Sequence, residues 1–600
     1  NWDAPILVSP HQPTRLYFAS QRVWQSNDRG DSWTPISKDL TRNQERVTLP
    51  IMDKAWSWDA PWDMLAMSAY NTITSLAESP QQEGLIYAGT DDGIIQVTEN
   101  GGDTWRKIEV GSLPGVPRTA FVDDIKADLF DANTVYVALD NHKYGDFNPY
   151  LLKSNDRGKT WRSVKGNLPG RTLVWRLVQD HVKPELLFLA TEFGIYTTID
   201  GGQKWIKLTG GLPTISFRDL AIQRRENDLV GASFGRSFYV FDDYSVLRNL
   251  SEEQLKKEAT LFAARKAWWY IERPVLSFNK TSDQGASYYV APNPPFGSTF
   301  TYYLVDEIKS KKATRQESEK SKIKANQNVP FPGWEAVETE RREQDPKILL
   351  TIKDGSGQVI RRLEGPVKKG FHRVTWDLRY PATEAIALVD RPTNNDDPPQ
   401  GLLAAPGTYT VAMAKQVNGV TTELAGPMKF EVERLRKGAL DGASPEASAA
   451  FWREIGQLNR DLSGTSLALR NGLTKINAMR KALDRATTNP GEMDAQLHQL
   501  RERLLSLDQQ LNGSRAKQEI GEKGKTTVSG HMSVAFTGTS YSTYGPTPTH
   551  KRSLEKGRTQ FSAIKEKLQQ ILNQELPEME KALIAAGAPW VEGQMIPIGQ

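Results

Sequence analysis

Cysteine is absent from this 600-residue sequence, which excludes disulfide bonds, thiolate metal sites and cysteine nucleophiles. Long apolar runs are missing too, since no stretch approaches the ~18 residues that a membrane-spanning helix needs. Neither sign of charge is in large excess, because 76 Lys and Arg face 72 Asp and Glu and leave a net charge of +4. Such a balance gives no general attraction to nucleic acids.

Recognisable catalytic motifs are also missing. None of the seven His lies near another at a metal-ligand spacing, and no Ser-His-Asp, P-loop or dinucleotide fingerprint occurs. The sequence therefore predicts no metal and no cofactor, and it identifies no catalytic residue. Its length is sufficient for two to four domains, each with its own core.

One eight-residue pattern recurs in the first third of the chain. Its skeleton is S/T-x-D/N-x-G-x-x-W, and the four copies are SNDRGDSW (26–33), TENGGDTW (98–105), SNDRGKTW (154–161) and TIDGGQKW (198–205). Short β-branched and aromatic stretches precede and follow the copies, as LIYAGT (85–90) does before the second. Four short antiparallel strands per repeat are typical of β-propeller blades.

The repeats predict a mainly β protein that begins with a β-propeller. A fifth unit, Arg218–Asp243, has three strand-like stretches but no octet. We therefore expect residues 1–243 to hold the five C-terminal blades of a larger, seven-bladed ring. The chain opens on NWDAPILVSP, with neither Met nor a signal peptide, and is interpreted as a mature or cleaved fragment or as one with further residues upstream.

The octets are interpreted as scaffold. Their Asp or Asn accepts backbone N–H bonds, their Gly permits a positive φ, and their Trp fills space between blades. One acidic ligand per copy is too few for a calcium site. The triplet Arg29-Gly30-Asp31 has the sequence of an adhesion motif, but the third copy has Arg157-Gly158-Lys159 instead, which argues against an adhesion role. The pattern resembles the Asp-box, or BNR repeat, of sialidases, sortilin-like receptors and tandem-propeller xyloglucanases.

The opposite face of the propeller is the expected ligand face, because the other turns and loops of each blade meet there. It carries acidic groups, one His and several Arg, which suit a sugar, peptide or carboxylate ligand. Turn chemistry alone also favours Asp and Asn at hairpin tips, and that alternative stays open. The candidate residues are Asp91, Asp92, Arg118, Asp140, His142, Arg171, Glu192, Arg218 and Arg236.

A long connection, residues 38–71, carries a tryptophan-rich stretch, KAWSWDAPWDM (54–64). One interpretation is a platform for stacking carbohydrate rings, with carboxylates as hydrogen-bond partners. The other is a plug that packs on an adjacent domain. The candidate residues here are Trp56, Trp58, Asp59, Trp62 and Asp63.

Three further segments follow the propeller. Residues 244–283 predict a connector with a helix, and residues 284–436 alternate apolar and polar side chains, as expected for an immunoglobulin- or fibronectin-III-like sandwich. A charged insertion at 308–346 is expected to be a solvated loop. Residues 437–600 predict an antiparallel helical bundle with a polar loop at 512–551, and its first helix starts at Ser444-Pro445.

The order of segments resembles a family of large secreted proteins of Gram-negative bacteria, labelled BNR-repeat or sortilin-like glycosyl hydrolases. The resemblance is carried by IYAGTDDG (86–93), GFHRVTWDLRYP (370–381) and APGTYTV (405–411), among others. The resemblance implies an upstream propeller and the first blades of this one, so an upstream region or a separate chain is expected to complete the ring. The sequence departs from the family at Phe234, in a position where the family has His.

Two functions are compatible with this resemblance. The first hypothesis is a non-enzymatic binding and assembly protein of the bacterial cell envelope that recognises a protein or glycan, since no residue matches a catalytic carboxylate. The alternative is a glycoside hydrolase with an active cleft between this propeller and an upstream one. Both imply a periplasmic, outer-membrane-associated or secreted protein, and neither involves nucleic acid.

Overall fold

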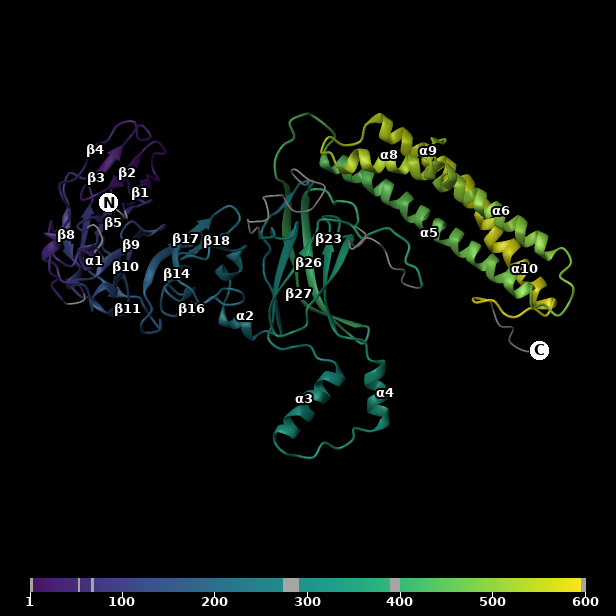
Figure 1. Cartoon of the computed structure of the whole chain (residues 1–600), viewed down its shortest axis with the longest axis horizontal. Coiled ribbons are helices and arrows are strands. Elements are labelled where there is room, and N and C mark those ends of the chain that lie inside the picture. Colours follow the sequence, from purple (N-terminus) through teal and green to yellow (C-terminus); the bar gives the residue numbers. More distant parts are fainter. Residues whose placement is uncertain (1–3, 52–53, 66–69, 273–290, 389–399, 595–600) are drawn as a thin grey trace. The chain divides into compact units, whose positions relative to one another are not determined.

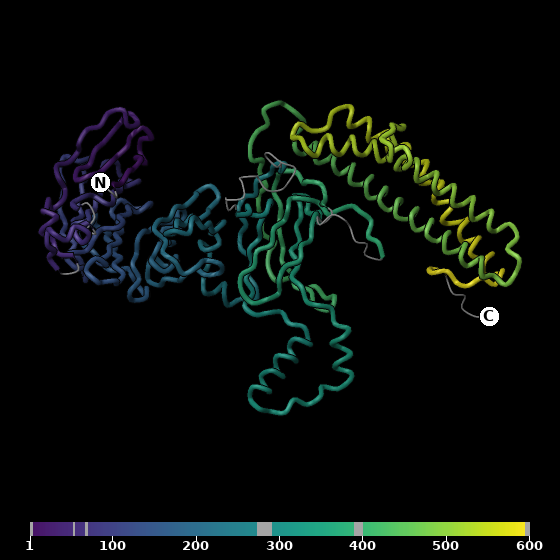
Figure 2. Tube along the Cα trace, viewed as in Figure 1, coloured from purple at the N-terminus to yellow at the C-terminus, as the bar shows by residue number. Residues whose placement is uncertain are grey.

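The computed structural model divides the chain into two compact units, Asn1–Glu252 and Glu253–Gln600. The structure describes residues 4–51, 54–65, 70–272, 291–388 and 400–594. Figures 1 and 2 show small sheets in the first unit, and sheets followed by long helices in the second. Within the described residues, no helix is both long and apolar enough to cross a bilayer.

The first unit is a succession of small antiparallel sheets, each built from consecutive strands (Figure 1). Over the described residues, four of these sheets have four strands and the last has three, as the octet pattern predicts for a propeller-like fold. The strands are β1 (Ile6–Val8), β2 (Leu16–Ala19), β3 (Val23–Ser26), β4 (Thr34–Pro35), β5 (Ile73–Glu78), β6 (Ile86–Thr90), β7 (Ile94–Thr98), β8 (Arg106–Glu109), β9 (Phe121–Ala127), β10 (Val135–Asn141), β11 (Asp146–Ser154), β12 (Arg162–Ser163), β13 (Val174–Gln179), β14 (Leu187–Thr191), β15 (Gly194–Thr198), β16 (Ile206–Lys207), β17 (Phe217–Gln223), β18 (Asp228–Ser233) and β19 (Phe238–Phe241).

Each sheet packs on the next through apolar side chains. Tyr87 of β6 and Val122 of β9, for example, belong to one buried cluster. Gly89 of β6 faces Val122 so closely that an added Cβ would stand 2.3 Å from a Val122 methyl group. Glycine at this position therefore sets how near neighbouring sheets can approach.

The octets form the hairpins between the third and fourth strands of their sheets. In the third copy, Ser154 Oγ donates to Asp156 (2.7 Å) and accepts the Gly158 N–H (2.8 Å). Asp156 also accepts the Thr160 N–H at 2.8 Å, and the Trp161 indole N–H donates to the Gly158 carbonyl at 3.1 Å. The acidic side chain is thus occupied by its own hairpin, which supports the scaffold interpretation.

The octet tryptophans differ in burial. Trp205 is buried and donates to the Val164 carbonyl of the preceding sheet at 3.0 Å, and Trp105 bonds Ile36 in the same way at 3.2 Å. Trp33 instead stays 40% exposed and bonds only within its own hairpin. The expected role as filler between sheets therefore holds for Trp105 and Trp205 but not for Trp33.

The second unit begins with two sheets that pack face to face. Phe300 and Phe430 touch across the interface with ring centroids 5.1 Å apart, and Trp376 lies 6.1 Å from Phe430. Residues 284–290, at the start of the predicted sandwich, lie outside the described residues. One sheet has the order β20-β22-β25 and the other β21-β27-β26-β23-β24, with β20 (Ala259–Leu261), β21 (Ala267–Trp269), β22 (Ser298–Leu304), β23 (Lys347–Lys353), β24 (Val359–Gly365), β25 (Gly370–Trp376), β26 (Gly407–Val417) and β27 (Val420–Arg434).

The connector contains a helix, as expected, together with two strands that were not predicted, whereas the charged insertion differs from expectation. In the connector, helix α2 covers only Glu252–Lys256, and β20 and β21 then join the two sheets because their apolar residues are buried there. The insertion is not an extended loop, since it forms helices α3 (Lys311–Lys324) and α4 (Trp334–Arg342). Arg315 stabilises this pair of helices by bonding Glu340 at 2.7 Å.

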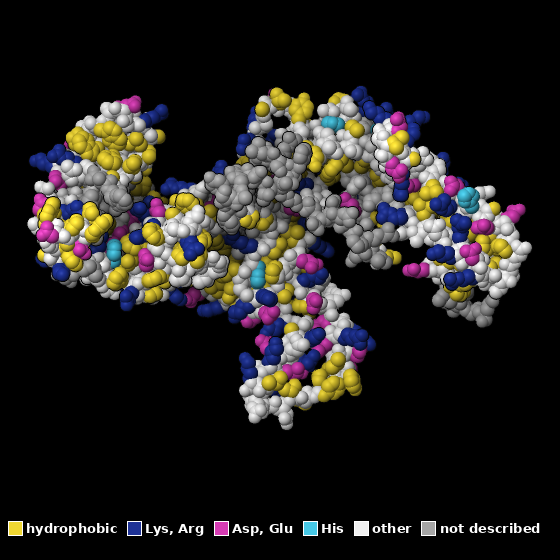
Figure 3. All heavy atoms as spheres, in the orientation of Figure 1, with side chains coloured by type: hydrophobic (Ala, Val, Ile, Leu, Met, Phe, Trp, Pro, Cys, Tyr) yellow, Lys and Arg dark blue, Asp and Glu magenta, His cyan; other side chains and the backbone are white. Residues whose placement is uncertain are grey.

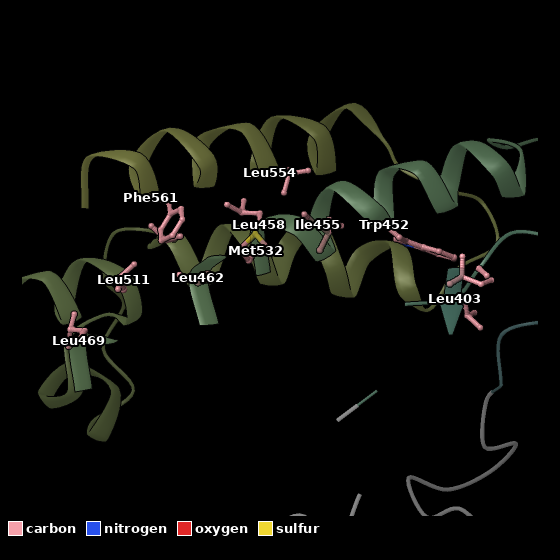
Figure 4. Packing of buried hydrophobic residues seen from close by; sticks show 14 of the residues in the cluster. Leu403, Trp452, Ile455, Leu458, Leu462, Leu469, Leu511, Met532, Leu554 and Phe561 are labelled. Carbon is pink, nitrogen blue, oxygen red and sulfur yellow. The ribbon is translucent and has the colours of Figure 1, made fainter. Parts of the chain in front are cut away.

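The chain ends in a helical region whose buried side chains are shown in Figure 4. Ser444 caps the first helix by accepting the Ala447 N–H at 3.1 Å. Trp452 of that helix packs inward and donates to Thr539 at 3.1 Å. The helices are α5 (Pro445–Leu483), α6 (Met493–Asn512), α7 (Arg515–Glu519), α8 (Val528–Ser540), α9 (Pro548–Gln570) and α10 (Leu576–Ala585).

The expected polar loop at 512–551 is largely helical, which corrects the prediction. Helix α8 lies within it and buries Val528, Met532 and Ala535. These residues are spaced by four and three and form one apolar stripe, but small and polar neighbours hide the pattern in the sequence.

Candidate functional site

The first strands of four successive sheets carry a β-bulge at equivalent positions. The unpaired residues are Thr74 in β5, Asp123 in β9, Trp175 in β13 and Arg218 in β17. These strands lie beside one another, so their bulges fall together. A bulge interrupts the alternation of a strand and redirects a side chain. All four residues line one cavity of about 630 Å³.

Asp123 and Asp140 form a pair of hydrogen-bonded carboxyl groups at this cavity. Burial raises the pKa of Asp123 well above its usual range, and the charge and hydrogen bond of Asp140 raise it further. The residue is partly exposed as a whole, but its Oδ2 atom is shielded from solvent and has no hydrogen-bond partner. Asp123 is therefore the member of the pair that holds its proton more strongly.

Asp140 is the ionised member of the pair. Burial opposes its ionisation, but hydrogen bonds and charge from His142 outweigh that effect and lower the pKa of Asp140. The His142 backbone N–H donates to Asp140 Oδ1 at 3.0 Å, and the His142 ring nitrogen Nδ1 contacts the same oxygen. The cavity thus places side by side two carboxyl groups whose pKa values are shifted in opposite directions.

A second cavity, of about 710 Å³, adjoins the first, since His142, Trp175 and Arg218 line both. Arg171 and Glu192 complete its polar lining. Glu192 Oε2 accepts the Trp175 indole N–H at 3.1 Å and thereby orients the ring. The guanidinium carbon of Arg218 lies 3.8 Å from the centre of that ring. This part of the site combines aromatic surface with positive charge.

A third, smaller cavity of about 240 Å³ lies where residues of the 38–71 connection meet Asp140 and His142. Ile51 and Tyr70 line it together with Asp91. The connection therefore covers part of the same face. Asp92 anchors it by accepting the Arg42 N–H at 2.6 Å, so its role is structural.

The structure brings together five of the candidates predicted from sequence: Asp140, His142, Arg171, Glu192 and Arg218. Arg118 and Arg236 are exposed and line none of the three cavities. In the part of the chain that the structure describes, no cluster of three His, Asp, Glu or Cys side chains could hold a metal ion.

The tryptophan-rich stretch is mostly exposed. Trp58 and Trp62 are 80% and 84% exposed, and Trp62 belongs to the short helix α1 (Pro61–Leu65). Trp56 is partly buried and donates to the Ile51 carbonyl at 3.2 Å, while Asp59 is exposed and Asp63 half-buried. Two broad indole faces are thus available to a ligand.

Asp123 and Trp175 were not predicted as site residues, because the candidate residues were chosen from turns and loops. The available signal was an ionisable pair inside a strand, FVDDIKA, whose neighbours are apolar. Charged residues also interrupt the apolar pattern of strands β13 (VWRLVQ) and β17 (FRDLAIQ). Charge in the interior of an otherwise apolar strand needs a partner or a function, and here it marks the bulges.

Asp91 gives this face a measurable pH dependence. Burial raises the pKa of Asp91 to about 7, with the Thr72 N–H opposing the shift and Asp92 adding to it. The native state therefore holds a proton that the unfolded chain releases near pH 4, and stability falls by up to about 1.4 kcal/mol per pH unit from about pH 4 to about pH 7.

Asp91→Asn should remove this dependence, because the amide oxygen can still accept the Thr72 N–H that Asp91 accepts at 2.8 Å. We expect the variant to be more stable than the parent protein at about pH 8, with the difference vanishing near pH 4. Calorimetric unfolding at both pH values measures it, with exposed Asp345→Asn as control. A difference that is constant with pH would contradict the prediction.

No family model matches the chain. It is 25% identical over 245 residues to a xyloglucanase of a Paenibacillus species, a match that covers 38% of this chain and 21% of the relative. It is 30% identical over 138 residues to xyloglucanase Xgh74A of Acetivibrio thermocellus, covering 21% and 16% respectively. A solved structure of the GH74 xyloglucanase of Xanthomonas campestris is similar with a TM-score of 0.30 and 16% identity, covering 44% of this chain and 40% of that one.

The curated relatives are xyloglucanases. The chain spans about a fifth of their length. These relatives overturn the first functional hypothesis, a non-enzymatic binding and assembly protein, because they are enzymes. The alternative stated from the sequence, a glycoside hydrolase, agrees better with them.

Proposed function

We propose that this chain is part of a glycoside hydrolase that cleaves a xyloglucan-type polysaccharide, and that the cavity at the four bulges belongs to its active cleft. The observation that carries the proposal is the hydrogen-bonded pair of carboxyl groups, Asp123 and Asp140, that lines the cavity, with the pKa of Asp123 raised and that of Asp140 lowered. The sequence similarity to xyloglucanases supports the same class of substrate.

Glycoside hydrolysis requires a carboxylic acid that protonates the leaving oxygen and a second carboxylate that attacks or activates water. Asp123 suits the first role, because its pKa is raised well above its usual range and its Oδ2 has no hydrogen-bond partner among the described residues. Asp140 is too close for the second role, which needs a separation of roughly 5–10 Å. Asp140 instead positions Asp123, and the second carboxylate would come from across the cleft.

An incomplete ring of blades is consistent with this arrangement. Ile6 and Val8 on the first sheet are 73% and 55% exposed, and Phe238 and Val240 on the last are 71% and 53% exposed. Figure 3 shows hydrophobic side chains gathered over the first sheet. Exposed apolar faces of this kind usually meet a partner. We propose that Asp-box blades from an upstream region or separate chain pack there and complete a seven-bladed propeller.

Trp58 and Trp62 are proposed as stacking surfaces for sugar rings, because both are exposed beside the polar side chains of Asp59 and Asp63. The paired sheets of the second unit are proposed to be an immunoglobulin-like module. An enzyme that acts on large polysaccharides must meet them outside the cell membrane, so an extracytoplasmic location follows from the proposal.

The test is an assay of the natural-length protein on purified polysaccharides. Release of reducing ends from xyloglucan is expected, with xylan and mixed-linkage β-glucan as comparison substrates. No release from any of the three, by protein shown to be folded, would overturn the proposal.

A further inference from the structure

Two guanidinium groups in the second cavity have no carboxylate partner. Arg171 and Arg218 both line it, and over the described residues neither forms an ion pair or a hydrogen bond. Neighbouring Arg176, in contrast, is held by Asp124 at 2.8 Å and Asp219 at 2.9 Å. The fold therefore neutralises a structural arginine nearby, whereas among the described residues Arg171 and Arg218 form no such ion pair and Arg218 acts on Asp123 only through its charge.

Both groups are stacked on aromatic rings. The Arg218 guanidinium carbon lies 3.8 Å from the Trp175 ring centre and 5.7 Å from that of Phe234. The Arg171 guanidinium carbon lies 5.5 Å from the Phe147 ring centre. Stacking covers the face of a guanidinium and leaves its N–H edge free to donate to a planar anion.

The charge of the cavity favours an anion. Glu192 is the acidic group of its lining, and Glu192 Oε2 already accepts bonds from Trp175 and from Ser216, the latter at 2.9 Å. Two arginines outnumber this single negative charge. Phe193, which is 46% exposed, adds an apolar surface on which the C–H face of a sugar ring can lie.

We propose that this cavity binds the carboxylate of a uronic acid unit, with Arg218 and Arg171 as donors. The inference rests on the proposed action on xyloglucan-type polysaccharides and adds that a uronic acid unit carried by the β-1,4-glucan chain is recognised in this cavity. Phe234 supplies a second aromatic ring beside Arg218.

The experiment compares two probes by titration calorimetry on the natural-length protein. One is a β-1,4-glucan oligosaccharide bearing a glucuronate unit, and the other is the same oligosaccharide after its carboxyl group is reduced. We expect the acidic probe to bind at least about tenfold more tightly. Arg218→Gln and Arg171→Gln should each remove most of that difference and leave the affinity for the neutral probe within about twofold.

Arg224→Gln is the matched control, because it removes the same charge from an exposed residue of the same unit that lines neither cavity. Equal affinity for the two probes would overturn the inference while leaving the proposed hydrolysis, measured separately, intact. An equal loss in Arg224→Gln would also overturn it, since the effect would then be general charge. Tighter binding of a sulfated probe would overturn the carboxylate assignment. Absence of both binding and hydrolysis would overturn both proposals.

Discussion

Replacing Asp123 with asparagine is expected to lower the rate of polysaccharide hydrolysis by about 100- to 10,000-fold, the usual contribution of a general acid. The amide has the shape of the acid and can still bond Asp140, but it carries no transferable proton. Reducing-end release at saturating xyloglucan measures the loss. Because the pKa of Asp123 is raised, activity of the parent protein should fall as the pH rises through that pKa.

The control is Asp345→Asn, an exposed carboxyl group in the second unit that lines none of the three cavities. It should keep the activity of the parent protein. Asp140→Asn should act differently, because it removes the negative charge that helps to raise the pKa of Asp123. Its alkaline limit of activity should move to lower pH. An Asp123→Asn variant that keeps more than about a tenth of the activity would refute the assignment of Asp123 as the acid.

Replacing Asp180 with alanine is expected to destabilise the first unit by about 3–5 kcal/mol, the range for breaking a buried ion pair. Asp180 is fully buried in the turn after β13 and bonds Arg248 twice, at 2.9 and 2.7 Å. It also accepts the Tyr244 hydroxyl at 2.7 Å and the Lys183 N–H at 2.7 Å. Its loss would leave the Arg248 guanidinium and the Tyr244 hydroxyl without this acceptor in the interior.

Urea unfolding and calorimetric unfolding of each variant measure this loss of stability. Tyr244→Phe removes a single hydrogen bond to Asp180 and should cost only about 1 kcal/mol. Arg225→Ala, which breaks an exposed pair with Glu226, should cost less than about 1 kcal/mol. Burial opposes the ionisation of Asp180, but Arg248 outweighs it and lowers the pKa of Asp180, so this stabilisation should be lost as the pH falls through that pKa. Similar losses in Asp180→Ala and Arg225→Ala would contradict the prediction.

Local features were predicted well from the sequence. The hairpins were predictable from the octets, because each octet contains its own hydrogen-bond acceptor, such as Asp156, and its own glycine, such as Gly158 with a φ of 78°. Ser444-Pro445 predicted the start of helix α5, because an N-cap residue and a proline in the first turn both stabilise a helix start through interactions within one turn. The hairpin at Asn418-Gly419 joins β26 to β27 with positive φ at both residues.

Features that depend on tertiary partners were missed. Strands β20 and β21 are three residues each and exist because β22 and β27 pair with them. Helix α8 buries its apolar stripe against helices α5, α6 and α9, which lie elsewhere in the sequence. No local signal in these segments is strong enough to override the polar residues around them.

The sequence by itself determined the repeated hairpins, the mainly β character of the first unit and the helical end of the second, since each of these follows from interactions over a few residues. Only the tertiary structure decided the candidate site. Asp123 and Asp140 lie on different strands, and the bulge in β9 turns Asp123 into the cavity that Trp175 and Arg218 share. The opposite pKa shifts of these two carboxyl groups arise from burial and from the approach of two chain segments, and neither can be inferred from the order of the residues.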